Sequence, residues 1–127
     1  MHKTVVAGLI LVAGIALGAG VVRGLYAQAP TKPAYVVAEV QVTDPAAFQA
    51  YAAKVPSTLA PYHGRYIVRG KPESKEGVAP QGVFVILEFD SLADAEKWYS
   101  TSPYKELIAE RQKAAKSNVF FVEGLPQ

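Results

Sequence analysis

The segment from residue 64 to residue 104 constrains the fold more than any other part of this sequence. It contains two β-rich runs, Gly64 to Gly70 and Val83 to Phe89, and the loop between them is rich in proline, glycine and charge. A helix signal follows directly, because Ser91 can cap the first turn of a helix. The segment therefore predicts a β-hairpin followed by a helix.

A strand and a helix precede this hairpin. Tyr35 to Val42 alternates between two faces, which is typical of a strand. Asp44 can cap a helix, and Pro45 fits the first helical position, where a missing N–H costs nothing. We expect Pro56 and Pro61 to end the regular helix, because proline inside a helix removes a backbone hydrogen bond.

Another helical piece and a last strand complete the chain. The helix restarts near Ser102 and runs to about Lys116, and Asn118 to Glu123 reads as a short strand. The order is β-α-β-β-α-β, the ferredoxin-like arrangement of the α+β class. Right-handed crossovers would place the first and third strands at the centre of a four-stranded antiparallel sheet.

Both helices of such a fold cover the same face of the sheet. The predicted strand alternation gives the other face a set of large apolar side chains: Tyr35, Val37, Ile67, Phe84, Ile86 and Phe121. Soluble monomers rarely expose so large an apolar surface. We therefore expect a homodimer in which two sheets pack against each other.

Charged residues share this predicted open face. Arg65 and Arg69 lie on one side of the second strand, and hairpin pairing would place Arg65 opposite Glu88 and Arg69 opposite Phe84. Glu39 adds a carboxylate from the first strand. These four charged side chains must be paired if the face is buried, because an isolated buried charge costs several kcal/mol.

The charges have two interpretations. Ion pairs of Arg65 with Glu88 and of Arg69 with Glu39 could fix the register of the dimer. Alternatively, the charges could lie at the mouth of an apolar cavity, where Arg65 or Arg69 binds a carboxylate or enolate and a glutamate moves protons.

Three other residues are candidates for a site. His63 is the one histidine after residue 30 and, with Glu88, a candidate base, although a lone loop histidine is more commonly a surface residue. Trp98 and Tyr99 are neighbours on a helix, so their side chains diverge by about 100°. One can pack in the core while the other forms a pocket wall. Further tyrosines with hydroxyls available to a ligand are Tyr35, Tyr51 and Tyr104.

The first 29 residues resemble an export signal. Lys3 gives a positive start, Thr4 to Val22 carries no charge, and Ala27-Gln28-Ala29 is a small-x-small cleavage pattern. We expect a mature domain of residues 30–127 in the periplasm or outside the cell. The alternative is an uncleaved membrane anchor, since 19 uncharged residues can nearly span a bilayer.

The mature composition argues against several kinds of partner. Lys3 and Arg23 are the two basic residues before Pro30, so eleven basic and eleven acidic residues remain and the net charge is zero. A nucleic-acid partner is not expected without a positive surplus. The sequence has no cysteine and no dinucleotide or phosphate-loop motif, so we expect neither a metal nor a cofactor.

Several motifs together resemble one family. Val42-Thr43-Asp44-Pro45, the run Gly64-Arg65-Tyr66-Ile67-Val68-Arg69-Gly70, Glu88-Phe89-x-Ser91, Trp98-Tyr99 and Val122-Glu123-Gly124 are similar to the "domain of unknown function 1330" family. The resemblance covers about Tyr35 to Gly124 and implies a dimeric α/β-barrel of ferredoxin-like subunits. It implies no catalytic residue, because the family has no established activity.

These observations lead to three hypotheses about function. The first is an exported homodimer that binds a small, partly apolar or anionic molecule between sheet and helices. The second is a cofactor-independent enzyme, similar to a monooxygenase or isomerase, acting on an aromatic or enolisable substrate with His63 or Glu88 as base and Arg69 as anion clamp. The third is a structural dimer without a ligand.

Overall fold

A computed structural model describes residues 31–127, and the predicted export signal lies outside the described residues. The order of elements is the predicted β-α-β-β-α-β, with the second helix divided in two. The elements are β1 (Ala34–Val42), α2 (Pro45–Leu59), a 3₁₀ turn (Ala60–Tyr62), β2 (Arg65–Gly70), β3 (Val83–Phe89), α3 (Leu92–Ser100), α4 (Ser102–Ala114) and β4 (Ala115–Glu123).

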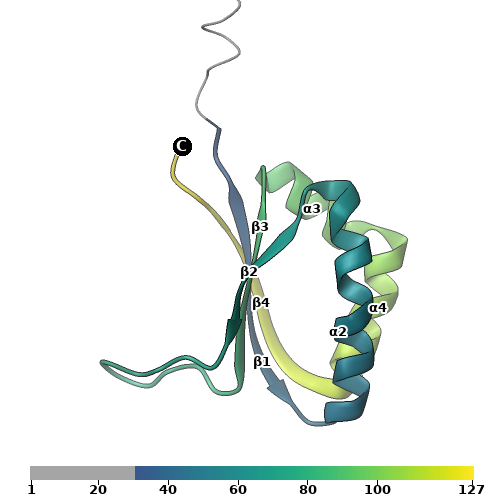
Figure 1. The fold of residues 1–127 in the computed structure, drawn as a ribbon, viewed down its shortest axis with the longest axis vertical. Coiled ribbons are helices and arrows are strands. Elements are labelled where there is room, and N and C mark those ends of the chain that lie inside the picture. Colours follow the sequence, from purple (N-terminus) through teal and green to yellow (C-terminus); the bar gives the residue numbers. More distant parts are fainter. Residues whose placement is uncertain (1–30) are drawn as a thin grey trace, which may run out of the picture. The chain divides into compact units, whose positions relative to one another are not determined.

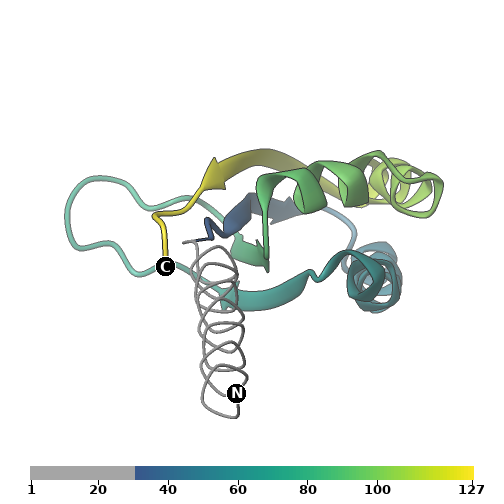
Figure 2. The same cartoon turned by 90° about the horizontal axis from the view of Figure 1, so that it is seen from above.

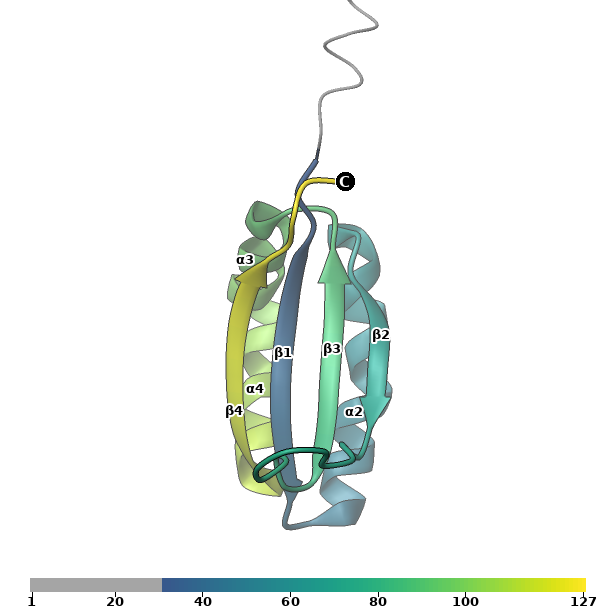
Figure 3. The same ribbon diagram turned by 90° about the vertical axis from the view of Figure 1, so that its left-hand side faces the viewer.

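The strands form one antiparallel sheet in the order β2-β3-β1-β4, with the first and third strands central as predicted (Figure 3). All three helices lie on one side of the sheet, and the other side carries no layer (Figure 1). The fold is therefore α+β and ferredoxin-like, with one covered face and one open face.

The core lies between the sheet and the helices. Val36 and Leu87 from the central strands pack with Val55 and Leu59 from α2, and Trp98 from α3 is 1% exposed. The loop between β2 and β3 projects from the open side of the sheet, away from the helices (Figures 1 and 2). No helix within residues 31–127 is long and apolar enough to cross a membrane.

The predicted helix boundaries were partly wrong. Asp44 caps α2 through a bond from the Ala47 N–H, as expected, but Pro56 lies inside α2 and the helix continues to Leu59. A single proline removes one hydrogen bond, and the buried stripe of Val55 and Leu59 holds the following turn against the sheet.

The last strand begins earlier than the sequence suggested. Helix α4 ends at Ala114 and β4 starts at Ala115, with no loop between them. The Ala114 carbonyl accepts bonds from the N–H groups of Thr43 (2.8 Å) and Asp44 (3.0 Å), which fixes the end of the helix beside the end of β1.

Two face assignments were also wrong. A β-bulge between Tyr66 and Val68 adds one residue to β2, so Arg69 pairs with Val85 rather than Phe84 and lies on the helix-covered face. Phe121 packs with the core on the covered face. The open face instead carries Phe120 and Val122, which are 45% and 48% exposed.

Candidate functional site

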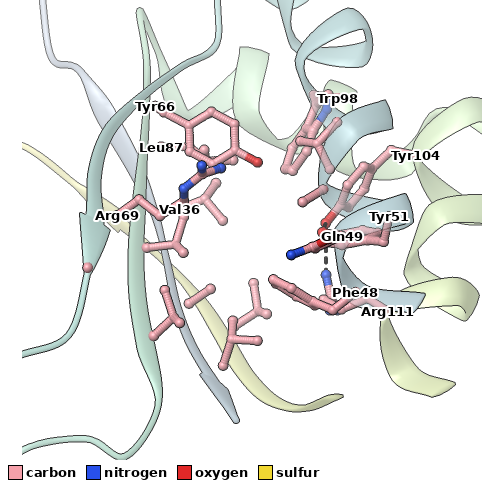
Figure 4. A pocket seen from close by; sticks show the side chains of 18 of the residues that line it. Val36, Phe48, Gln49, Tyr51, Tyr66, Arg69, Leu87, Trp98, Tyr104 and Arg111 are labelled. Carbon is pink, nitrogen blue, oxygen red and sulfur yellow. Dashed lines mark hydrogen bonds between the residues drawn. The ribbon is translucent and has the colours of Figure 1, made fainter. Parts of the chain in front are cut away.

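A cavity of about 380 Å³ lies between the sheet and helices α2 and α4 (Figure 4). It is lined mainly by apolar side chains, with a small number of polar ones, which is the usual composition of a small-molecule pocket. The lining residues are Val36, Ala38, Val40, Phe48, Gln49, Tyr51, Ala52, Val55, Tyr66, Arg69, Gly70, Lys71, Val83, Val85, Leu87, Trp98, Tyr104, Arg111 and Val119.

Small side chains leave this space open. Ala38 lies between Val36 and Val40 on the covered face of the central strand β1, and Ala52 lines the cavity from α2. A larger side chain at either position would extend into the gap between the two layers. The two alanines therefore leave a space that larger side chains would fill in a close-packed core.

Arg69 lines the cavity because of the bulge in β2, and it remains exposed to solvent there. Its guanidinium lies 5.6 Å from the centre of the Tyr66 ring, a cation–π contact that holds the charge at the cavity wall. Burial raises the pKa of Tyr66 to about 12, so its hydroxyl stays protonated at neutral pH and can donate a hydrogen bond.

A second guanidinium lies across the cavity from Arg69 (Figure 4). Arg111 on α4 is only 6% exposed, and its Nη1 donates to the Tyr104 hydroxyl at 2.8 Å. That hydroxyl is also 2.8 Å from the Tyr51 hydroxyl on α2. Burial raises the pKa of Tyr104, so both the phenol and the charge of Arg111 persist at neutral pH.

Trp98 and Tyr99 diverge on α3, but they do not divide into a core residue and a pocket wall as expected, because Trp98 takes both roles. Trp98 packs in the core and lines the cavity, and its ring N–H donates to the Thr58 hydroxyl at 3.0 Å. Tyr99 is half-buried outside the cavity lining and makes an edge contact with Phe121, with ring centres 5.5 Å apart.

Arg65, Glu88 and Glu39 lie on the open face, away from the cavity. Arg65 forms an ion pair with Glu88 as predicted, and its Nη1 lies 3.6 Å from Asp90. Partial burial and the neighbouring Glu88 carboxylate raise the pKa of Tyr35. Glu39 accepts a bond from Asn118 at 3.3 Å rather than from Arg69, which the bulge places on the opposite face.

His63 lies at the surface before β2, with its side chain 65% exposed. Its Nδ1 is 3.5 Å from Asp94 and 3.9 Å from Asp90, so the three residues form one exposed group of ligand-type atoms. The carboxylate of Asp90 already has Arg65 as a cationic neighbour. Neither His63 nor Glu88 lines the cavity, so the structure does not bring the two candidate bases to the pocket.

Arg111 and Lys71 are cationic cavity residues that sequence reasoning missed. The signal was present, because Tyr104, Leu107 and Arg111 recur at the helical spacing of the inward face. A charged residue in the position of an apolar one is informative, since buried arginine is rare without a specific partner.

Solved structures share this fold. Protein RPA0582 of unknown function from Rhodopseudomonas palustris has a TM-score of 0.61 and 18% identity, with 84% of this chain and 92% of that chain covered. A dimeric ferredoxin-like protein of unknown function from Thermobifida fusca has a TM-score of 0.54 and 13% identity, covering 75% and 92%. SnoaB, a cofactor-independent oxygenase from Streptomyces nogalater, has a TM-score of 0.51 and 11% identity, covering 72% and 91%.

At these identities the likeness establishes the fold alone. A search of curated proteins finds no match to the sequence. The family model described as "Domain of unknown function (DUF1330)" matches residues 33–125, nearly all of the described domain. The resemblance seen in the sequence motifs is thereby confirmed, and this chain belongs to the DUF1330 family.

Proposed function

We propose that this protein binds a small, partly apolar, anionic molecule in the cavity between sheet and helices. One observation carries the proposal: three cationic residues, Arg69, Lys71 and Arg111, line the cavity and no acidic residue of the described chain does. An apolar cavity with unopposed positive charge favours an anion with an apolar body.

Binding fits the lining better than acid–base chemistry. The titratable lining residues are arginine, lysine and tyrosine, and the pKa values of Tyr66 and Tyr104 are raised by burial. Such groups donate hydrogen bonds near neutral pH but do not accept protons there. Histidine and carboxylates are not among the cavity residues within 31–127.

A fluorescence titration tests the proposal. Trp98 is the single tryptophan of the sequence and lines the cavity, so its emission reports occupancy. The probe is anilinonaphthalene sulfonate, an apolar anion. We expect saturable quenching of Trp98, and Arg69→Met should weaken binding by about tenfold, since hydrogen bonds to charged groups contribute roughly 1.5–3 kcal/mol.

Two variants make this test specific. Arg65→Met is the matched control, because it removes an arginine of the same strand from the open face and should leave affinity unchanged. Ala38→Leu should block binding by filling the cavity while the protein remains folded. Unchanged binding in both Arg69→Met and Ala38→Leu would contradict the proposed site.

A cofactor-independent enzyme is the second candidate. SnoaB has the same fold and is described as a cofactor-independent oxygenase. The cationic lining would stabilise the enolate of a substrate acidic enough to lose its proton to water. Oxygen consumption with enolisable aromatic substrates, compared between wild type and Arg69→Met, distinguishes this candidate from simple binding.

We further propose that two copies pair through the open faces of their sheets. That face carries Val37, Ile86 and Phe120 without a covering layer. The ferredoxin-like neighbour from Thermobifida fusca is described as dimeric. The loop between β2 and β3 projects on the same side, where it would reach the second copy (Figure 1).

Sedimentation equilibrium tests the pairing. Phe120→Asp should convert the dimer to a folded monomer, because a carboxylate in a sheet-to-sheet interface would be buried without a partner. Ala53→Asp, on the exposed surface of α2, is the control and should leave the dimer intact. A wild-type monomer at micromolar concentration would contradict the pairing.

Export remains a proposal that rests on the residues before Pro30. The positive start, the uncharged run and the Ala27-Gln28-Ala29 pattern support it. Mass analysis of the protein recovered from the periplasm or medium should give a chain that begins at Pro30. A full-length chain in the membrane fraction would support the anchor instead.

A further inference from the structure

Arg111 is a buried cation that the described chain does not neutralise. It makes none of the salt bridges found within residues 31–127, and the neighbouring Glu110 pairs with Lys54 at 2.8 Å instead. The Arg111 Nε is buried without a hydrogen-bond partner. Burying a charge and a donor in this way is costly unless something else compensates them.

Arg111 and two neighbouring tyrosines form a group of hydrogen-bond donors at the cavity wall. The Arg111 guanidinium and the hydroxyls of Tyr104 and Tyr51 form one connected set, and all three side chains line the cavity. The Tyr51–Tyr104 bond uses one of the two hydroxyl protons, so the other proton and the remaining N–H groups of Arg111 can donate to a carboxylate. The raised pKa of Tyr104 keeps that phenol neutral, so it does not itself neutralise Arg111.

This set and Arg69 lie on opposite sides of the cavity. Arg69 comes from β2 beside Tyr66, whereas Arg111 comes from α4 beside Tyr104 (Figure 4). The walls between them are valines and leucine from the sheet, with Phe48 from α2. The cavity is thus apolar in the middle and cationic at two separate places.

We propose that the ligand carries two anionic groups separated by an apolar body, with Arg69 binding one group and Arg111, Tyr51 and Tyr104 binding the other. This inference rests on the proposed function and specifies its ligand class as an apolar dicarboxylate. The second anion neutralises Arg111, which explains why the fold tolerates a buried guanidinium without a carboxylate partner.

Calorimetric titration with matched acids tests the inference. The probes are linear dicarboxylates from hexanedioate to dodecanedioate, each compared with the monocarboxylate of equal length. We expect one dicarboxylate of the series to bind about tenfold or more tightly than its monocarboxylate. Arg111→Met should abolish that preference, so that each dicarboxylate binds no more tightly than its monocarboxylate.

Two further variants keep the test decisive. Tyr104→Phe retains the ring that packs against Trp98 and removes only the hydroxyl, so it should reduce the preference by several fold even if Arg111→Met does not fold. Arg65→Met, on the open face, should retain the full preference.

The outcomes separate the inference from the proposed function. Monocarboxylates that bind as tightly as dicarboxylates, with Arg111→Met and Tyr104→Phe unchanged, would overturn the second anion site and leave anion binding at Arg69 intact. If the wild-type protein binds no carboxylate at all, both the second anion site and the proposed anion binding are overturned. A dicarboxylate preference that requires Arg111 supports the inference.

Discussion

The two sides of the sheet differ in whether their arginines form ion pairs. On the open face, Arg65 pairs with Glu88 and lies near Asp90 within the same chain. On the covered side, Arg69 of β2 and Arg111 of α4 line a cavity and make no ion pair within the described residues. The ion pairs therefore lie on the open face, whereas the cavity side has one buried arginine, Arg111, and one exposed arginine, Arg69, without an ion pair.

This difference separates structural from functional charge. Pairing on an exposed surface contributes little stability, but it prevents an unpaired charge if the face becomes buried against a second copy. A buried cation without an ion pair, such as Arg111, destabilises the empty protein unless a ligand compensates it, whereas Arg69 is exposed to solvent. The comparison favours the covered face as the site and the open face as an interface.

The largest contrast is expected for aromatic truncation. Trp98→Ala should lower the free energy of unfolding by about 3–5 kcal/mol, because the ring is fully buried and its N–H bonds to Thr58. Phe120→Ala should cost less, and its cost should grow with protein concentration, since only a dimer buries that ring. Urea unfolding at several protein concentrations measures both effects.

Replacing the arginines should change stability in opposite directions. Arg111→Met in the ligand-free protein should leave the free energy of unfolding unchanged or raise it by up to about 2 kcal/mol, because an apolar side chain of similar length replaces an uncompensated charge. Arg65→Met should lower it by about 1 kcal/mol or less. A large loss of stability in Arg111→Met would mean that Arg111 is a structural residue.

Alkaline pH should lower the free energy of unfolding through the ionisation of Tyr66, which lies on the covered face. The folded pKa of Tyr66, about 12, lies above its ordinary value of 10.0, so the unfolded chain loses this proton first. The contribution of Tyr66 to the free energy of unfolding is complete below pH 10 and is lost as the pH rises toward 12. Unfolding free energies across this range should decline less steeply in Tyr66→Phe than in wild type, and Tyr35→Phe on the open face gives the comparison.

The smallest effect is expected from deleting Ile67. The bulge makes one residue of β2 extra, so its removal should restore regular pairing and leave Arg69 facing the helices. Affinity for anilinonaphthalene sulfonate should change by less than about twofold, because the lost side chain is exposed. Strong loss of binding would show that the bulge positions Arg69 in a way that simple pairing cannot reproduce.

Much of the fold could be predicted because its signals are local. The cap at Asp44, the capped start at Ser91 and the alternation of β1 depend on residues close together in sequence. The position of Arg69 could not be predicted, because a single extra residue reverses every face assignment after it. The prediction that Pro56 ends the helix was wrong, because the tertiary packing of Val55 and Leu59 outweighs the one lost hydrogen bond.

The candidate site was predicted only in part. Arg69 and Trp98 were named from the sequence and line the cavity, whereas Glu39, Glu88, Arg65, Tyr99 and His63 lie elsewhere. Tyr51 and Tyr104 were general candidates, and their joint contact with Arg111 depends on α2 and α4 lying side by side.

The sequence by itself determined the order of elements, the class of fold, the family and the existence of an open apolar face. The order of elements, the fold class and the open face follow from periodicity and caps, which act over a few residues, and the family follows from the resemblance of its motifs. Only the tertiary structure decided which charges meet each other and which meet the cavity. That outcome depends on the register of β2 and on the packing of α4 over the sheet, and both are set by contacts between residues far apart in the chain.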